Sequence, residues 1–151
     1  MTADVRIERA EVDDLGAVVE LLRGVGLPVD DVAYHIEAFV LAREDGQVVG
    51  TSAIEVHGDA VLLRSVAVAP SHRGRGIADV LMAESEAMAV IEGARHLYLL
   101  TTTAADYFAV RGFEIVTREV AGAAIGEAMQ FRSLCPASAT CMRRAVAGGI
   151  G

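Results

Sequence analysis

Two arginines and two glycines lie together in the middle of the chain, in a segment that could bind an anion. The segment Arg73-Gly74-Arg75-Gly76 follows the apolar run Val61–Val68 and precedes apolar residues with helical spacing. This pattern predicts a strand, a turn and the N-terminus of a helix, where unpaired N–H groups attract negative charge. Because glycine has no Cβ atom, an anion could approach this backbone closely. The segment therefore predicts a phosphate site.

Titratable side chains lie close to the same apolar run. Glu55 and His57 come near the end of the preceding predicted strand, where either could accept a proton or simply face solvent. Arg64 lies inside the apolar run, where a charged group is costly unless it is paired. It could bind a substrate carboxylate or oxyanion through two hydrogen bonds, pair with Glu55 or another carboxylate, or lie on an exposed face. The sequence leaves these alternatives open.

The composition limits the class of protein. With 151 residues and 53% hydrophobic content, the chain is long enough for one folded domain, which we expect over residues 1–146, with 147–151 as a flexible tail. The net charge of −8 argues against nucleic acid as a partner, because binding a phosphate backbone needs a broad basic face. No apolar run reaches the length of a membrane span, and the charged N-terminus lacks the apolar core of a secretory signal. We therefore expect a cytoplasmic protein without a membrane partner.

The two cysteines do not form a zinc pattern. Cys135 and Cys141 have neither the spacing nor the neighbouring histidines of a zinc site, so we expect no metal and interpret both as packing residues. Thiolates are soft ligands, which keeps a soft-metal or arsenic(III) site open as an alternative.

Hydrophobic periodicity and turn residues predict the elements that position these groups. Hairpins are expected to give antiparallel strand pairs, and strand-helix-strand passages parallel ones, so the order predicts a mixed α/β sheet with helices on its faces. The last strand is expected at an edge of the sheet. Strands are predicted over residues 5–10, 39–43, 48–56, 61–68, 96–102, 113–117 and 140–146, and helices over 13–22, 30–36, 77–91, 104–111 and 119–129.

Two common nucleotide-binding loops do not fit the glycine segment. A Walker A loop needs a lysine followed by Ser or Thr after its last glycine, and none is present. The Rossmann fingerprint needs a third glycine and a place after the first strand, whereas Gly74 and Gly76 follow a predicted three-stranded meander.

The segment instead resembles the Q/R-x-x-G-x-G/A motif of the GNAT N-acetyltransferases. Residues 62–76, LLRSVAVAPSHRGRG, carry the motif with its strand, and residues 99–113, LLTTTAADYFAVRGF, resemble the later strand-helix element of that family, which ends in Gly-Phe. The likeness extends over nearly the whole chain. It is strongest to N-acetylglutamate-synthase-like enzymes and to ArsN-type arsenic-resistance acetyltransferases, the latter also through residues 131–144, FRSLCPASATCMRR.

The resemblance implies the GNAT fold, a central and mostly antiparallel sheet of about six to seven strands flanked by helices. It also implies that acetyl-CoA is the co-substrate and that its pyrophosphate lies on the glycine loop. In this family the strand before the glycine loop, here the predicted strand 61–68, diverges from its neighbour. Its main-chain groups would bind the pantetheine arm and polarise the acetyl carbonyl. The residues implied in cofactor binding are Val66, Ala67, Val68, Arg73, Gly74, Arg75, Gly76, Ile77, Ala78 and Phe108.

The remaining site residues are candidates for catalysis and for substrate binding. Many family members have a tyrosine acid at the position of Phe108, so the neighbouring Tyr107, or water, would protonate the CoA thiolate here. We interpret Glu55, His57 and Tyr107 as catalytic candidates. The candidates for substrate binding are Arg64, Ser65, Thr101, Thr102 and Arg132.

The sequence thus predicts an acetyl-CoA-dependent N-acetyltransferase that acts on the primary amine of a small, amino-acid-like acceptor. The alternatives are an N-acetylglutamate-synthase-like enzyme or a non-catalytic acetyl-CoA-binding module of the same fold, which the phenylalanine at position 108 favours. A homodimer is common in the resembled family, and the sequence leaves the oligomeric state open.

Overall fold

The computed structural model describes residues 5–146, so the tail expected at residues 147–151 lies outside the described residues. Its contacts divide the chain into two compact units. The first contains residues 5–54 and 65–87, and the second contains residues 55–64 and 88–146. Three continuous elements, two strands and one helix, each contribute residues to both units. The single domain expected from the sequence stays a prediction.

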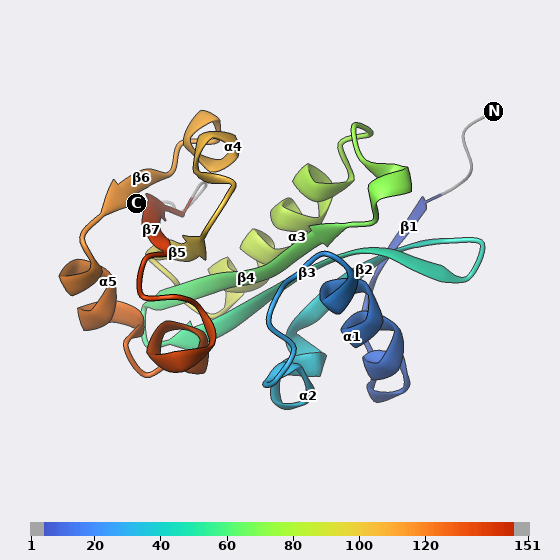
Figure 1. The fold of residues 1–151 in the computed structure, drawn as a ribbon, viewed down its shortest axis with the longest axis horizontal. Helices are drawn as coiled ribbons and strands as arrows, with labels where there is room; N and C mark the ends of the chain where they lie inside the picture. The colour runs from blue at the N-terminus through green and yellow to red at the C-terminus, as the bar shows by residue number, and fades with distance from the viewer. Residues whose placement is uncertain (1–4, 147–151) are drawn as a thin grey trace. The chain divides into compact units, whose positions relative to one another are not determined.

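Seven strands form a mixed sheet with helices between them, as the sequence predicted (Figure 1). The strands are hydrogen-bonded in the order β1-β2-β3-β4-β5-β7-β6. Antiparallel pairing joins β1 to β2, β2 to β3, β5 to β7 and β6 to β7, whereas β4 and β5 are parallel because a helix connects them. The strands are β1 Val5–Arg9, β2 Phe39–Glu44, β3 Gln47–His57, β4 Ala60–Val68, β5 His96–Thr101, β6 Glu114–Val116 and β7 Thr140–Ala145, and the α-helices are α1 Leu15–Gly24, α2 Val32–His35, α3 Ile77–Ile91, α4 Ala105–Val110 and α5 Arg118–Ile125.

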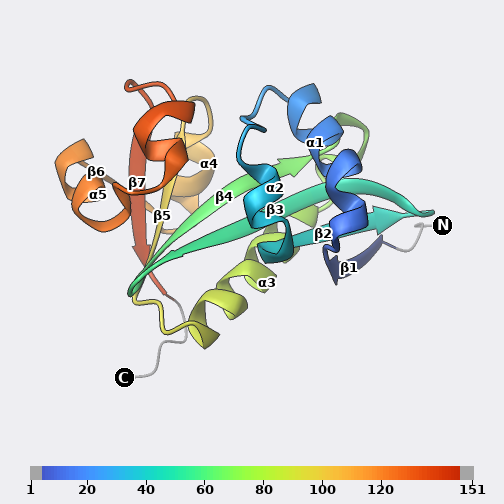
Figure 2. The ribbon, with the colours of Figure 1, turned by 90° about the horizontal axis from the view of Figure 1, so that it is seen from below.

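In the first unit, helices cover both faces of the strands, which explains why β2 is apolar at successive positions (Figure 2). Phe39 and Leu41 belong to one core with residues of α1 and α2. The opposite face of the strands meets α3, where Ser52 on β3 and Ser85 on α3 share a hydrogen bond of 2.8 Å. A strand with only one covered face would alternate apolar and polar residues instead.

The start of the first helix differs in detail from the expectation. Residues Val12–Asp14 form a short 3-10 turn before α1, so the two aspartates precede the helix. The Asp14 carboxylate accepts a hydrogen bond from the Glu11 backbone N–H at 2.8 Å and another from Arg43. The backbone hydrogen bond, and then the Arg43 guanidinium, lower the pKa of Asp14 below its ordinary value.

The buried face of α3 is set by small and polar residues as well as by aliphatic ones. Val80 and Ile91 belong to the apolar residues whose spacing predicted this helix, but they are 49% and 82% exposed. The apolar spacing therefore predicted the helix but only part of its buried face. The buried residues recur every four positions, at Ile77, Leu81, Ser85 and Ala89.

Close approach of α3 to β3 depends on a glycine. A Cβ atom at Gly50 would lie 2.9 Å from Leu81 Cδ1 and 3.2 Å from Ile77 Cγ2. It would also lie 3.3 Å from the backbone oxygen of Ala67. The absence of a side chain at this position therefore lets the helix lie against the strand.

In the second unit, β7 lies between β5 and β6, so the expectation that the last strand forms an edge is wrong. The short β6 is the edge strand. The helix predicted over 119–129 is present as α5 but ends at Ile125, and a π-helical turn, Gln130–Leu134, follows it. Helix α5 contributes Ala121 and Ile125 to a core with Tyr98 and Cys141.

Both cysteines are free thiols. Burial raises the pKa of the Cys141 thiol, which favours the neutral form and agrees with a packing role. Within residues 5–146, no helix combines the length and the apolar character that crossing a bilayer requires.

Candidate active site

The predicted phosphate site is an exposed loop between a buried strand and a long helix. Residues 73–76 are exposed, whereas Ile77, the first residue of α3, is 6% exposed. Gly74 and Gly76 have φ angles of 79° and 77°, a region that L-residues with a Cβ atom rarely adopt. Open space lies where Cβ atoms at these two positions would be. The loop therefore exposes its backbone, as binding of a phosphate requires.

The stem of this loop is held by its own hydrogen bonds. The backbone N–H of Ala69 donates to Val49 O at 2.8 Å, and that of His72 donates to Ala69 O at 2.8 Å. Arg73 Nε donates to Val68 O at 3.1 Å. These bonds fix the chain on either side of the turn that follows β4.

Strand β4 has an irregular backbone at Ser65, just before the residues that the family resemblance places against the cofactor. Ser65 has a φ of 55°, which is unusual for a residue with a side chain and marks a local distortion. Thr51 Oγ1 donates to Ser65 O at 2.7 Å and so stabilises it. The parallel ladder between β4 and β5 ends at Leu62 opposite Tyr98, although β5 continues to Thr101. The distortion precedes Val66–Val68, whose main chain is predicted to meet the cofactor.

Three of the predicted residues form one polar cluster in the second unit. Glu55 Oε1 accepts a hydrogen bond from Arg64 Nη1 at 3.0 Å, and Glu55 Oε2 lies 2.7 Å from His57 Nε2. Arg64 and Glu55 are 3% and 8% exposed. The salt bridge that the sequence left open for Arg64 is therefore present, and it compensates a buried charge without a substrate. Substrate binding by Arg64 stays a prediction.

The two aromatic candidates on α4 have different surroundings. Phe108 is 8% exposed and its ring packs edge-on against Phe113, with centroids 5.7 Å apart. These contacts give it a place in the core, and its predicted contact with the cofactor stays a prediction. The Arg111 guanidinium lies 3.6 Å above the half-buried Tyr107 ring, and Arg111 Nη1 donates to Tyr107 O. Tyr107 is thus held in place by a cation on its ring face.

The other predicted substrate residues have mostly local contacts. Thr101 Oγ1 accepts the Ala104 N–H at 2.9 Å and so helps to start α4. Thr102 and Arg132 are exposed, and Arg132 lies 3.8 Å from the exposed Glu127 carboxylate. Surface ion pairs of this kind contribute little to stability.

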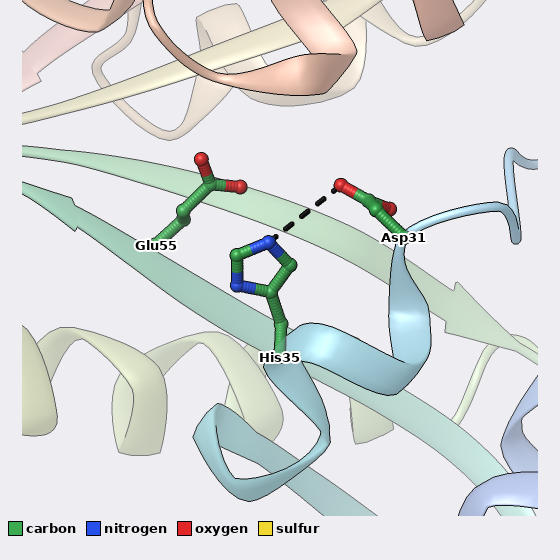
Figure 3. Close-up of side chains that lie close together, drawn as sticks. All are labelled: Asp31, His35 and Glu55. Atoms are coloured by element: carbon green, nitrogen blue, oxygen red, sulfur yellow. Dashed lines mark ion pairs between the residues drawn. The ribbon is translucent and has the colours of Figure 1, made fainter.

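The structure also shows polar pairs that were not expected from the sequence. Asp31 is fully buried, and its carboxylate lies 3.7 Å from Nε2 of His35, one helical turn later (Figure 3). The Asp-x-x-x-His spacing can be seen in the sequence and could have indicated this pair. The burial of Asp31 can be seen only in the structure. Glu44, at the end of β2, contacts His72 and Arg75 beside the glycine loop. No local pattern connects residues so distant in the sequence.

A family model described as an acetyltransferase (GNAT) domain matches residues 35–115, more than half of the chain. The chain belongs to the GNAT acetyltransferase family. The matched residues of this GNAT chain include β2–β5, the glycine loop, α3 and α4. The resemblance to this family, which was based on the glycine loop and the Gly-Phe element, is therefore confirmed.

The similar proteins include amino-acid acetyltransferases. The chain is 31% identical to the amino-acid acetyltransferase of Ectopseudomonas mendocina over 117 residues, which are 72% of this chain and 27% of that protein. It therefore spans about a quarter of the length of this curated relative.

Solved structures show the same fold at low sequence identity. An N-acetylglutamate synthase from Neisseria gonorrhoeae, in complex with coenzyme A and N-acetyl-glutamate, has a TM-score of 0.82 at 22% identity, over 97% of this chain and 36% of that one. A diaminobutyrate acetyltransferase from Paenibacillus lautus, in complex with L-2,4-diaminobutyric acid and coenzyme A, has a TM-score of 0.68 at 17% identity, over 96% of both chains. These likenesses confirm the predicted GNAT fold.

Proposed function

We propose that this chain is an acetyl-CoA-dependent N-acetyltransferase whose acceptor is the primary amine of a small, amino-acid-like molecule. The observation that carries the proposal is the exposed glycine loop between β4 and α3, in a chain that belongs to the GNAT family. The names of its relatives support an amino-acid acceptor, because both the curated relative and the two solved structures are named for amino-acid substrates or products.

The cofactor would bind along β4 and the loop that follows it. The backbone N–H groups of residues 73–78 would hold the pyrophosphate, and Arg73 or Arg75 would add charge-assisted hydrogen bonds. Main-chain groups of Val66–Val68 would bind the pantetheine arm and donate to the acetyl oxygen. A donor of this kind typically contributes about 3 kcal/mol to the stability of the transition state.

The reaction forms an amide and releases a thiol. The neutral amine nitrogen attacks the thioester carbonyl carbon, the C–S bond breaks, and the electron pair leaves with sulfur as the CoA thiolate. The amine must lose a proton and the thiolate must gain one. We assign the second transfer to Tyr107 or to water, as the sequence predicted.

The geometry favours His57 as the group that accepts the amine proton. With its proton on Nε2, His57 donates to Glu55 Oε2, and the lone pair on Nδ1 can accept a proton. Glu55 would fix the ring and its tautomer, while Arg64 keeps a positive charge beside the carboxylate. Both Glu55 oxygens already have partners, which makes Glu55 the poorer direct base.

A single assay tests the enzyme against the non-catalytic module, which the phenylalanine at position 108 still favours. The protein is incubated with acetyl-CoA, a thiol-detecting dye and a panel that includes glutamate, phosphinothricin, arsinothricin and simple amines. CoA release that depends on an amino-acid amine supports the proposal, and the preferred member of the panel separates a glutamate-type acceptor from an arsenic-bearing one. Binding of acetyl-CoA without turnover of any amine would support the module instead.

The same assay tests the proton acceptor. His57→Gln should lower kcat by about 10²-fold or more, with little change in the KM for acetyl-CoA. Glu55→Gln should lower kcat less, because the ring of His57 keeps its own lone pair. If His57→Gln retains full kcat, His57 is not the base.

A further inference from the structure

A carboxylate lies beside the glycine loop that is proposed to bind the pyrophosphate. By its charge alone, this carboxylate would weaken the binding of an anion there. Glu44 Oε1 is 2.8 Å from His72 Nε2, and Glu44 Oε2 accepts a hydrogen bond from Arg75 Nη1 at 3.3 Å. The side chains of Glu44 and His72 are only 16% and 14% exposed. The Glu44–His72 contact is thus partly shielded from water, whereas the exposed Arg75 adds an ordinary surface ion pair.

Glu44 is held at a fixed point by a tight hairpin. It is the last residue of β2 and pairs with Gln47, the first residue of β3, across the two-residue turn Asp45-Gly46. The turn residues have φ angles of 52° and 80°, as a type I′ hairpin turn requires. The hairpin fixes the backbone of Glu44, and the contacts with His72 and Arg75 hold its carboxylate, so it can serve as an anchor.

The loop side of the contact is also ordered. Ser71 Oγ lies 2.7 Å from His72 Nδ1, so both ring nitrogens of His72 have partners. The hydrogen bond from His72, and then the charges of His72 and Arg75, lower the pKa of the Glu44 carboxyl below its ordinary value, which keeps it ionised. His72 directly precedes the exposed residues 73–76, and Arg75 lies within them.

We propose that Glu44 is a positioning residue for the cofactor loop: through His72 and Arg75 it fixes the loop in the conformation that binds the CoA pyrophosphate. This inference rests on the proposed function, because it places the pyrophosphate on residues 73–78. It has an unusual consequence, in that a negative charge beside the loop increases the affinity for an anion.

The sign of the effect distinguishes positioning from charge. If Glu44 acts only through its charge, its removal should strengthen the binding of an anionic ligand. If it fixes the loop, Glu44→Ala should raise the Kd for CoA by about three- to tenfold, since loss of an anchoring pair leaves the loop to be ordered on binding. Glu44→Gln keeps an oxygen acceptor, so its Kd for CoA should lie between those of Glu44→Ala and the wild type.

The experiment is calorimetric titration of CoA and of dephospho-CoA into the full chain, with steady-state kinetics beside it. The KM for acetyl-CoA should rise in Glu44→Ala while kcat and the KM for the amine stay unchanged. The fold-change in Kd should be the same for both ligands, because they share the pyrophosphate and differ in the 3′-phosphate. A loss seen with CoA alone would contradict the assignment to the pyrophosphate.

Matched variants control for charge and for the partner. Asp45→Asn removes the same charge from the next residue, which is exposed, and should not weaken CoA binding. His72→Gln can still donate to Glu44 and should bind CoA better than His72→Phe, which cannot. Equal or tighter binding of CoA by Glu44→Ala would overturn the inference. Failure of the wild type to bind CoA would instead refute the proposed function.

Discussion

At the scale of single residues, the polar side chains of this chain act in pairs and clusters rather than alone. Arg64 is the clearest case. Its place in an apolar strand signals that a partner exists, because an unpaired buried charge is costly, and the structure supplies Glu55 as that partner. The sequence could establish that a partner was needed. It could not show whether the partner of Arg64 is a substrate carboxylate or a carboxylate on a neighbouring strand, because that depends on which side chains meet in space.

A residue-scale prediction concerns the pH dependence of stability. The pKa of Asp14 is lowered in the folded state, so Asp14 binds its proton more weakly there than in the unfolded chain, where the pKa is about 3.9. It therefore stabilises the fold above that pKa, and the contribution is lost as the pH falls through the lower, folded pKa. Asp14→Asn should lower the free energy of unfolding by about 1 kcal/mol near neutral pH.

Urea unfolding at a series of pH values measures this effect. The difference between wild type and Asp14→Asn should shrink steadily once the pH falls below about 4, because Asp14 of the unfolded chain becomes protonated first and that of the folded protein at lower pH. Asp13→Asn, one residue earlier and exposed, serves as the control and should change the urea midpoint little. A difference that stays constant down to about pH 2 would show that the charge of Asp14 is not its source.

At the scale of elements, packing across the β3–α3 contact depends on a missing side chain. A Cβ atom at Gly50 would lie within 3.3 Å of Leu81, Ile77 and the Ala67 backbone. Gly50→Ala should therefore destabilise the protein by about 1–3 kcal/mol, the usual cost of an overpacked core. Denaturant unfolding followed by circular dichroism measures it.

The control is the same substitution where nothing is crowded. Gly16 lies exposed on α1, and open space lies where its Cβ atom would be. Gly16→Ala should raise stability by about 0.5–1 kcal/mol, because alanine favours the helix. Opposite signs for the two variants are expected. Stabilisation by both would mean that α3 has room to move away from β3.

The sequence predicted the local elements well and their arrangement less well. The strand, the loop and α3 followed from Gly74, Gly76 and the apolar spacing, because turns and helix starts depend on neighbouring residues. The expectation that residues 140–146 form an edge strand failed, because strand order depends on pairing between distant segments. For the same reason the contact of Glu44 with His72, 28 positions apart, could not be predicted.

At the scale of the whole molecule, the charge is unevenly distributed. The chain carries a net charge of −8, yet His72, Arg73 and Arg75 lie together at the loop where an anionic cofactor is proposed to bind. A local basic cluster on an acidic protein concentrates attraction for a small anion at one point. This agrees with a small-molecule ligand.

The connectivity of the chain predicts that the whole molecule unfolds in one step. The boundary between the two units falls inside β3, β4 and α3, between residues 54 and 55, 64 and 65, and 87 and 88. Unfolding one unit alone would interrupt these three elements and leave some of their backbone groups without partners. We therefore expect circular dichroism, which reports both units, and tyrosine fluorescence to give the same urea midpoint.

The two probes can be separated because the chain has three tyrosines and no tryptophan. Tyr34 is 81% exposed, whereas Tyr98 is 5% exposed in the second unit, so Tyr98 should contribute much of the fluorescence change. Gly50→Ala, which lies in the first unit, should then lower the midpoint seen by Tyr98 as much as the midpoint seen by circular dichroism. If the Tyr98 midpoint keeps its wild-type value while circular dichroism shows two transitions, the units unfold separately. The three shared elements would then be too weak to couple them.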